Sequence, residues 1–130
     1  MAIYGKQFAC GEFEVTEDSG EATDTIFQVA ANKKVLLKSI LWYISAVAGT
    51  AAEITGHGLV ITDSSDNELG KVSWKSGTPA AATSDTGFVW VEKNIEMADQ
   101  QKLKLWINTS VGANKTLTVK VVAGGAEEDV

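Results

Sequence analysis

The sequence contains no arginine, and this absence bears first on nucleic acids. All 11 basic residues are lysines, and 17 acidic residues bring the net charge to -6. Arginine supplies bidentate contacts to phosphate and guanine, and nucleic-acid binders also gain affinity from a cationic surface. The sequence therefore argues against a nucleic-acid partner and, by the same charge, against an anionic membrane. The lysines gather at Lys33, Lys34 and Lys38 and at Lys102 and Lys104, where we expect solvated strand edges.

Cysteine and histidine occur once each, as Cys10 and His57. One cysteine excludes an intrachain disulfide, and one of each excludes a His/Cys zinc cluster within a single chain. Cys10 follows an apolar stretch, so we expect it to be buried as a small hydrophobe. His57 lies between two glycines, where we expect an exposed β-bulge, and no nucleophile accompanies it. The sequence thus predicts no catalytic residue, no cofactor, no metal site and no enzyme activity.

Long apolar runs are also missing. No stretch approaches the roughly eighteen apolar residues of a membrane span, and the opening segment MAIYGKQFACGEFEV lacks the basic and apolar regions of an export signal. A length of 130 residues fits one domain. We expect that domain over residues 1–125, with 1–20 as an N-terminal arm or edge strands and 126–130 as a loose acidic tail.

What the chain does contain is strand after strand. Short β-branched and aromatic segments are separated by clusters of Gly, Ser, Asn and Asp, with one proline, Pro79, in a long polar loop. Residues 35–46 show little alternation, which predicts a central strand covered on both faces. Residues 103–107 and 117–121 both alternate apolar and polar side chains, which predicts a hairpin with one buried face.

A second hairpin is predicted from residues 51–62, joined through a loop at 63–70 to Val72 and Trp74. A one-residue bulge near Gly56 to Gly58 would turn both apolar stretches of residues 51–62 toward the core. The segments add up to about seven to nine short strands, so we predict an all-β fold, a single antiparallel β-sandwich or jelly roll. The side chains expected in its core are Phe27, Leu37, Ile40, Leu59, Phe88, Leu105 and Val119.

The loop at 63–70 offers oxygen ligands from Asp63, Asp66, Asn67 and Glu68. Such a set could hold Ca²⁺, but its spacing is not that of an EF-hand. Asp, Ser and Asn are also the ordinary residues of a hairpin loop, and this interpretation is the one we favour.

Four tryptophans are many for a chain of this size. Trp42 and Trp90 lie in apolar runs and are expected in the core. Trp74 and Trp106 lie beside lysines, so one or both could be exposed, as a platform for sugars or an anchor for a protein partner, or could form a second, covered layer. The residues we expect to contact a partner are Trp74, Trp106, Tyr4 and Phe8.

Three segments carry a resemblance to a known group of proteins: TIFQVAANKKVLLKSILWYIS at 25–45, the loop at 63–70, and MADQQKLKLWI at 97–107. They resemble small β-sandwich virion proteins of tailed bacteriophages, which include capsid decoration or cement proteins and head or tail accessory proteins. Those proteins often have Pro-Ala-Gly at the first turn, where this sequence has Ala30-Ala31-Asn32. Asparagine tolerates the left-handed conformation, so we expect the turn to survive.

The resemblance implies a viral structural protein that decorates or cements a capsid, binds the major capsid protein and stabilises the head. It also implies a homo-oligomer, with a trimer as the expected order, synthesised in the host cytoplasm and located on the capsid surface of the virion. Two alternatives stay open at this point. One is a neck, tail or fibre accessory protein, and the other is a carbohydrate-binding β-sandwich module that uses an exposed tryptophan.

Overall fold

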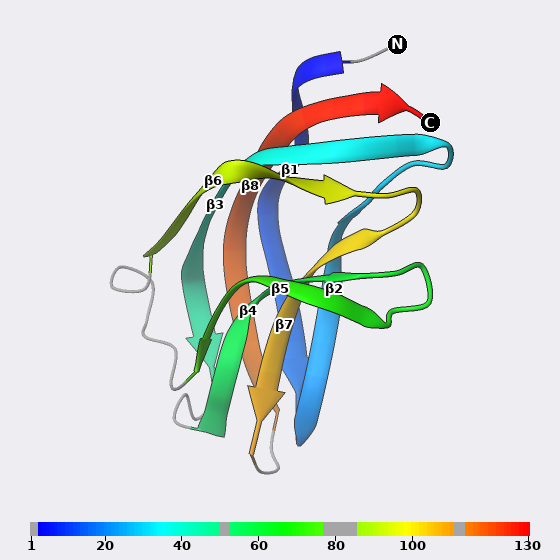
Figure 1. Ribbon diagram of the computed structural model, residues 1–130. Coiled ribbons are helices and arrows are strands. Elements are labelled where there is room, and N and C mark those ends of the chain that lie inside the picture. Colours follow the sequence, from blue (N-terminus) through cyan, green and yellow to red (C-terminus); the bar gives the residue numbers. More distant parts are fainter. Residues whose placement is uncertain (1–2, 50–52, 77–85, 111–113) are drawn as a thin grey trace.

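The computed structural model describes residues 3–49, 53–76, 86–110 and 114–130, and the side chains at 3–4, 73–76 and 86–94 lie outside this description. Figure 1 shows the strands layered into a sandwich. The strands are β1 (Ile3–Glu17), β2 (Gly20–Gln28), β3 (Lys33–Ala48), β4 (Ile54–Thr62), β5 (Glu68–Ser76), β6 (Thr86–Met97), β7 (Lys102–Thr109) and β8 (Lys115–Asp129). In the described residues no helix is long and apolar enough to cross a membrane.

The strands form two four-stranded sheets. The first sheet has the order β1-β8-β3-β6, the second has the order β2-β7-β4-β5, and neighbouring strands in both are antiparallel. The chain changes sheet at each connection except β4 to β5, and its first and last strands pair with each other. This order is that of a jelly roll, so the predicted all-β sandwich is confirmed.

The apolar core lies between the sheets. The interior strand β3 of the first sheet contributes several of its side chains. Val35 and Leu37 point into the core, and so do Ile40, Trp42 and Ile44. The two sets have opposite parity, because a register shift next to Lys38 inserts one extra residue into β3. That shift explains why the sequence showed little alternation. The prediction of an interior strand is confirmed, but Lys38 is exposed, so the outer face of β3 is not covered throughout.

A similar bulge serves β4. Ile54 pairs with Thr109 and Gly56 pairs with Asn108, which leaves Thr55 as an extra residue. Leu59 and Ile61 consequently reach the core, as predicted, with the bulge one residue before the predicted position. Of the predicted core, Leu37, Ile40, Leu59, Leu105 and Val119 are buried, Phe27 is half-buried against them, and the side chain of Phe88 lies outside the described residues.

The predicted hairpin of residues 103–107 with 117–121 is wrong. The first segment belongs to β7 in the second sheet and the other to β8 in the first sheet, so the two face each other across the core. Their alternating patterns set which face is buried but not which strand lies alongside. The other predicted hairpin, β4 with β5, is confirmed.

The acidic tail is not loose. Residues 126–129 continue β8 and pair with β3, and Val130 donates its backbone N–H to the carbonyl of Asn32. Lys33 pairs with Asp129, and Lys6 Nζ lies 3.0 Å from Glu127 Oε1. The acidic side chains of the tail therefore form ion pairs with lysines of the adjacent strands.

Candidate functional site: binding surfaces of the sandwich

Of the two alternatives left open for Trp106, an exposed platform and a covered position, the structure supports the covered one. Its indole lies on the outer face of the second sheet but is only 6% exposed. Lys71 places its Nζ 4.9 Å from the indole centroid, a cation–π contact that covers the ring. Gly58 pairs with Trp106 on one side and Trp74 on the other, so the two tryptophan positions flank a residue that has no side chain. The side chains of Trp74 and Tyr4 lie outside the described residues, and their predicted role stays a prediction.

Phe8 lies where β1 meets β2. Its ring is half-buried and stacks on Phe27, with 5.3 Å between centroids and 19° between planes. Lys6 Nζ lies 5.8 Å from the centroid of Phe8. The two aromatic rings join the first sheet to the second at this edge, and Phe8 retains some exposed surface that a partner can contact.

A hollow of about 310 Å³ opens beside Trp106. Val60 and Trp106 line it from the sheet, and Glu21, Asp66 and Lys71 contribute charged groups. Its volume is at the lower limit for small-molecule sites, and its charged groups are exposed. The hollow can accept a small polar group, which is less than the broad aromatic platform that the sequence suggested.

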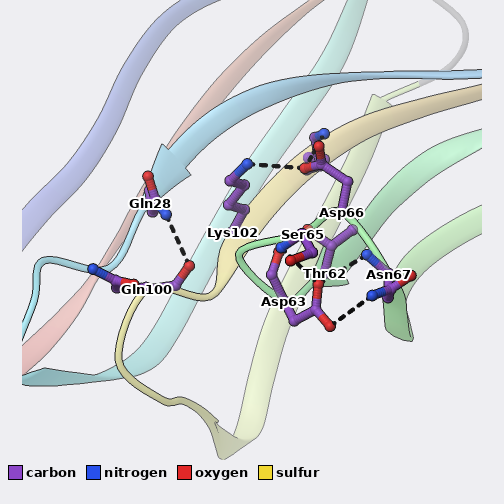
Figure 2. Close-up of polar contacts among 9 residues, drawn as sticks. Gln28, Thr62, Asp63, Ser65, Asp66, Asn67, Gln100 and Lys102 are labelled. Atoms are coloured by element: carbon purple, nitrogen blue, oxygen red, sulfur yellow. Dashed lines mark hydrogen bonds and ion pairs between the residues drawn. The ribbon is translucent and has the colours of Figure 1, made fainter.

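Asp66 forms ion pairs with two lysines of β7. Its Oδ1 accepts hydrogen bonds from Lys102 Nζ at 2.9 Å, drawn in Figure 2, and from Lys104 Nζ at 2.8 Å. These two hydrogen bonds lower the pKa of Asp66 from 3.8 to about 2, and the bond from Lys104 has the larger effect. Lys104 is buried and β7 is an interior strand, so the prediction of a solvated strand edge is wrong for these two lysines. The same correction applies to Lys33 and Lys34, which belong to the interior strand β3.

Asp63 shapes the turn between β4 and β5. It accepts hydrogen bonds from the backbone N–H groups of Ser65 and Asn67, at 2.8 and 2.9 Å, and from Asn67 Nδ2 at 3.0 Å (Figure 2). The bonds from Asn67 lower the pKa of Asp63. Within the described residues, no group of three or more His, Cys, Asp or Glu side chains could hold a metal ion. Asp63 acts as a turn-forming acceptor, as the hairpin interpretation predicts, whereas the carboxylate of Asp66 accepts from lysines of β7.

Three turns meet at this end of the sandwich, and each contains one non-glycine residue in the left-handed region. These are Asn32 (φ 62°), Asp66 (φ 68°) and Gln100 (φ 62°). Asn32 donates its N–H to Asp99 Oδ2 at 3.1 Å. Gln28 Nε2 donates to the carbonyl of Gln100 at 3.0 Å, as Figure 2 shows. The expected left-handed Asn32 is confirmed. These bonds tie the β2–β3 turn to the β6–β7 turn, so this end presents a fixed polar surface.

Two further predictions are wrong. His57 is 1% exposed and meets Trp42 edge-on, with 6.2 Å between ring centroids. The bulge at Thr55 lies before His57 and turns its side chain into the core. Cys10 is exposed, because Ala9 takes the buried position and successive side chains of a strand point to opposite faces.

A groove of about 420 Å³ lies between the edge strands β5 and β6 and was not predicted from the sequence. Leu69, Val72 and Ile95 supply its apolar lining, and Leu69 is 54% exposed. In the sequence, Leu69 is a single apolar residue in a polar loop, and nothing in that pattern shows that β6 would come to lie opposite. The groove is a feature of the three-dimensional arrangement alone.

No family model and no curated protein matches this sequence. Among solved structures, the chain is similar to a chain in the structure of infectious bursal disease virus, Gx strain, with a TM-score of 0.50 and 15% identity over 98% of this chain and 30% of that chain. The Gt strain of that virus gives a TM-score of 0.37 with 14% identity, over 98% of this chain and 32% of that chain. A crystal structure of FLHE gives a TM-score of 0.35 with 8% identity, over 94% of this chain and 99% of that chain. The chain thus shares its fold with a segment, less than a third in length, of a chain from a virus structure.

Proposed function

We propose that this chain is a structural protein of a virus particle, and that it decorates or cements a capsid by binding the major capsid protein. The observation that carries the proposal is the jelly-roll strand order, which extends over the whole described chain. The alignment with a chain of a virus structure covers 98% of this chain and 30% of that chain. The resemblance of residues 25–45 and 97–107 to tailed-phage virion proteins supports the finer part, attachment to a capsid.

The edge strand β1 supports attachment through strand surfaces. It is 15 residues long and pairs with β8 on one side, and within the described residues no strand pairs with its other edge. Its register with β8 is unbroken from Ala9 to Glu17, so this stretch can meet a partner strand. Phe8 and the predicted contact residue Tyr4 both belong to β1. We therefore place the contact with the capsid protein on β1, with backbone hydrogen bonds along the edge and the ring of Phe8 beside it.

The test is the composition and structure of particles purified from the virus that encodes the chain. Mass spectrometry should find the chain in stoichiometric amounts, and a cryo-EM map should show an eight-stranded jelly roll on the shell, with β1 against the capsid protein. Particles that lack the chain while its gene is expressed would contradict the proposal. Density at the neck, tail or fibre would retain a virion protein but reject the decoration role.

The glycan-binding alternative loses Trp106 as a platform and now depends on Trp74. A glycan array with tryptophan fluorescence titration tests it. The expected result is no binding, and a glycan whose affinity depends on Trp74 would favour this alternative. We also propose that the chain catalyses no reaction, and turnover of any small molecule by the purified chain would contradict that part.

A further inference from the structure

Two β-bulges shape the strand that borders the groove. Leu59 pairs with Ser73 and Val60 with Lys71, so Val72 is an extra residue in β5. By the same comparison, Ile61 pairs with Gly70 and Thr62 with Glu68, which makes Leu69 a second extra residue. Bulges redirect side chains, and here the two extra residues are two of the apolar residues that line the groove.

The bulges also make strand addition on β5 unfavourable. A partner strand needs backbone N–H and C=O groups at regular spacing, and two extra residues within five positions interrupt that spacing. Whatever binds in the groove should therefore contact it through side chains. Leu69 offers the clearest anchor, because it is one of two large apolar side chains that stand exposed in the described part of the chain.

The rims of the groove carry opposite charges. Lys71 lies on the β5 side, and Glu96, whose side chain is 63% exposed, lies on the β6 side. Within the chain, Lys71 Nζ lies over the ring of Trp106, and Glu96 Oε1 is 4.0 Å from Lys34 Nζ. Both are exposed residues on flexible stems, so each can also reach a charged group on a facing surface.

This arrangement is complementary to itself. A two-fold axis that runs along the groove sets the β5 rim of one copy against the β6 rim of the other. Lys71 of each copy then faces Glu96 of the other, on both sides of an apolar seam made by Leu69, Val72 and Ile95. An interface with an apolar centre and charged pairs at its rim has the usual composition of a specific contact.

We propose that the groove between β5 and β6 is the site where two copies of this chain associate, through side chains and about a two-fold axis. The pairing does not depend on the virion role, since a chain that stays monomeric could still bind a capsid. It replaces the trimer expected from the resemblance by a two-fold dimer.

The first test is sedimentation velocity and mass photometry of the purified full chain across a concentration series. The wild-type chain should form a reversible dimer, and Leu69→Asp should weaken it by at least about tenfold, because a charge would enter the apolar seam. Val130→Asp is the matched control: Val130 is the other exposed large apolar residue and lies away from the groove lining, so its dimer should be unchanged. Circular dichroism should show the same fold for both variants.

The second test uses charge exchange between copies. Lys71→Glu alone and Glu96→Lys alone should each weaken the dimer, because each creates two like-charge contacts. An equimolar mixture of the two variants should dimerise again, because in the mixed pair both contacts join opposite charges. A wild-type chain that is monomeric at about 100 μM or forms trimers, a Leu69→Asp variant that dimerises normally, or a mixture that stays monomeric would each overturn the proposal.

Discussion

The two long edges of the sandwich are built differently. At one edge β1 packs along β2, and the stacked rings of Phe8 and Phe27 join the sheets. At the other edge β5 and β6 border a groove in which Leu69 stands exposed. The chain therefore closes its core on one side with its own aromatic side chains and leaves apolar surface on the other. The contrast indicates that the stacked rings at the first edge contribute stability, whereas the apolar groove at the second edge is suited to self-association.

A related contrast separates the interior of the first sheet from the open edge, and glycine substitutions should give the largest effect. A Cβ added at Gly125 in β8 would lie 1.9 Å from the carbonyl oxygen of Leu36, whereas at Gly70 in β5 it would meet nothing within 4 Å. We expect Gly125→Ala to lower the free energy of unfolding by about 3 kcal/mol, because the β8 and β3 backbones must separate. Gly70→Ala is its matched control and should change little. Urea unfolding followed by circular dichroism checks both, and equal effects would contradict the difference in backbone packing.

Breaking the aromatic stack should have the next largest effect. Phe27→Ala removes the ring that holds Phe8 and opens the closed edge. Because Phe27 is only half-buried, we expect a loss of about 2 kcal/mol, less than for a fully buried phenylalanine. Thermal unfolding measures the change, and a variant as stable as the wild type would show that the stack does not hold this edge.

Acid should weaken the turn next to the open edge. The hydrogen bonds from Lys104 and Lys102 lower the pKa of Asp66 from 3.8 to about 2. As the pH falls, the Asp66 carboxylate therefore takes up its proton at a lower pH in the folded state than in the unfolded state. The stabilising contribution is therefore complete above about pH 4 and is lost as the pH falls through about 2. Asp66→Asn should lower stability near pH 7, and its difference from the wild type should disappear near pH 2. A difference that persists at the acid end would rule out this carboxylate as the cause.

Removing the exposed side chain at the open edge should have the smallest effect on stability. Leu69→Ala deletes apolar surface that the single chain leaves in water, so the free energy of unfolding of the monomer should change by less than about 0.5 kcal/mol. Unfolding of a dilute sample measures it. A loss comparable to that of Phe27→Ala would mean that the two edges do not divide stability and association between them.

The sequence was informative wherever one strand determines the outcome. Alternation placed Leu105 and Val119 in the core, and the turn chemistry of Asp63 and Asn67 predicted the β4–β5 hairpin. It failed where two strands distant in the sequence meet. The pattern left open whether Trp106 is exposed, and Lys71 of β5 covers its ring. A bulge reversed the expected direction of His57. Period-two patterns report faces, but they do not report partners or one-residue insertions.

Hydrogen–deuterium exchange at increasing concentration tests the difference between the edges most directly. We predict that peptides covering residues 68–72 and 95–97 become more protected as the concentration rises, while peptides from β1 and β2 exchange at a constant rate. Protection that rises along β1 and β2, with no change at 68–72, would contradict the account and place self-association on the edge that we describe as closed.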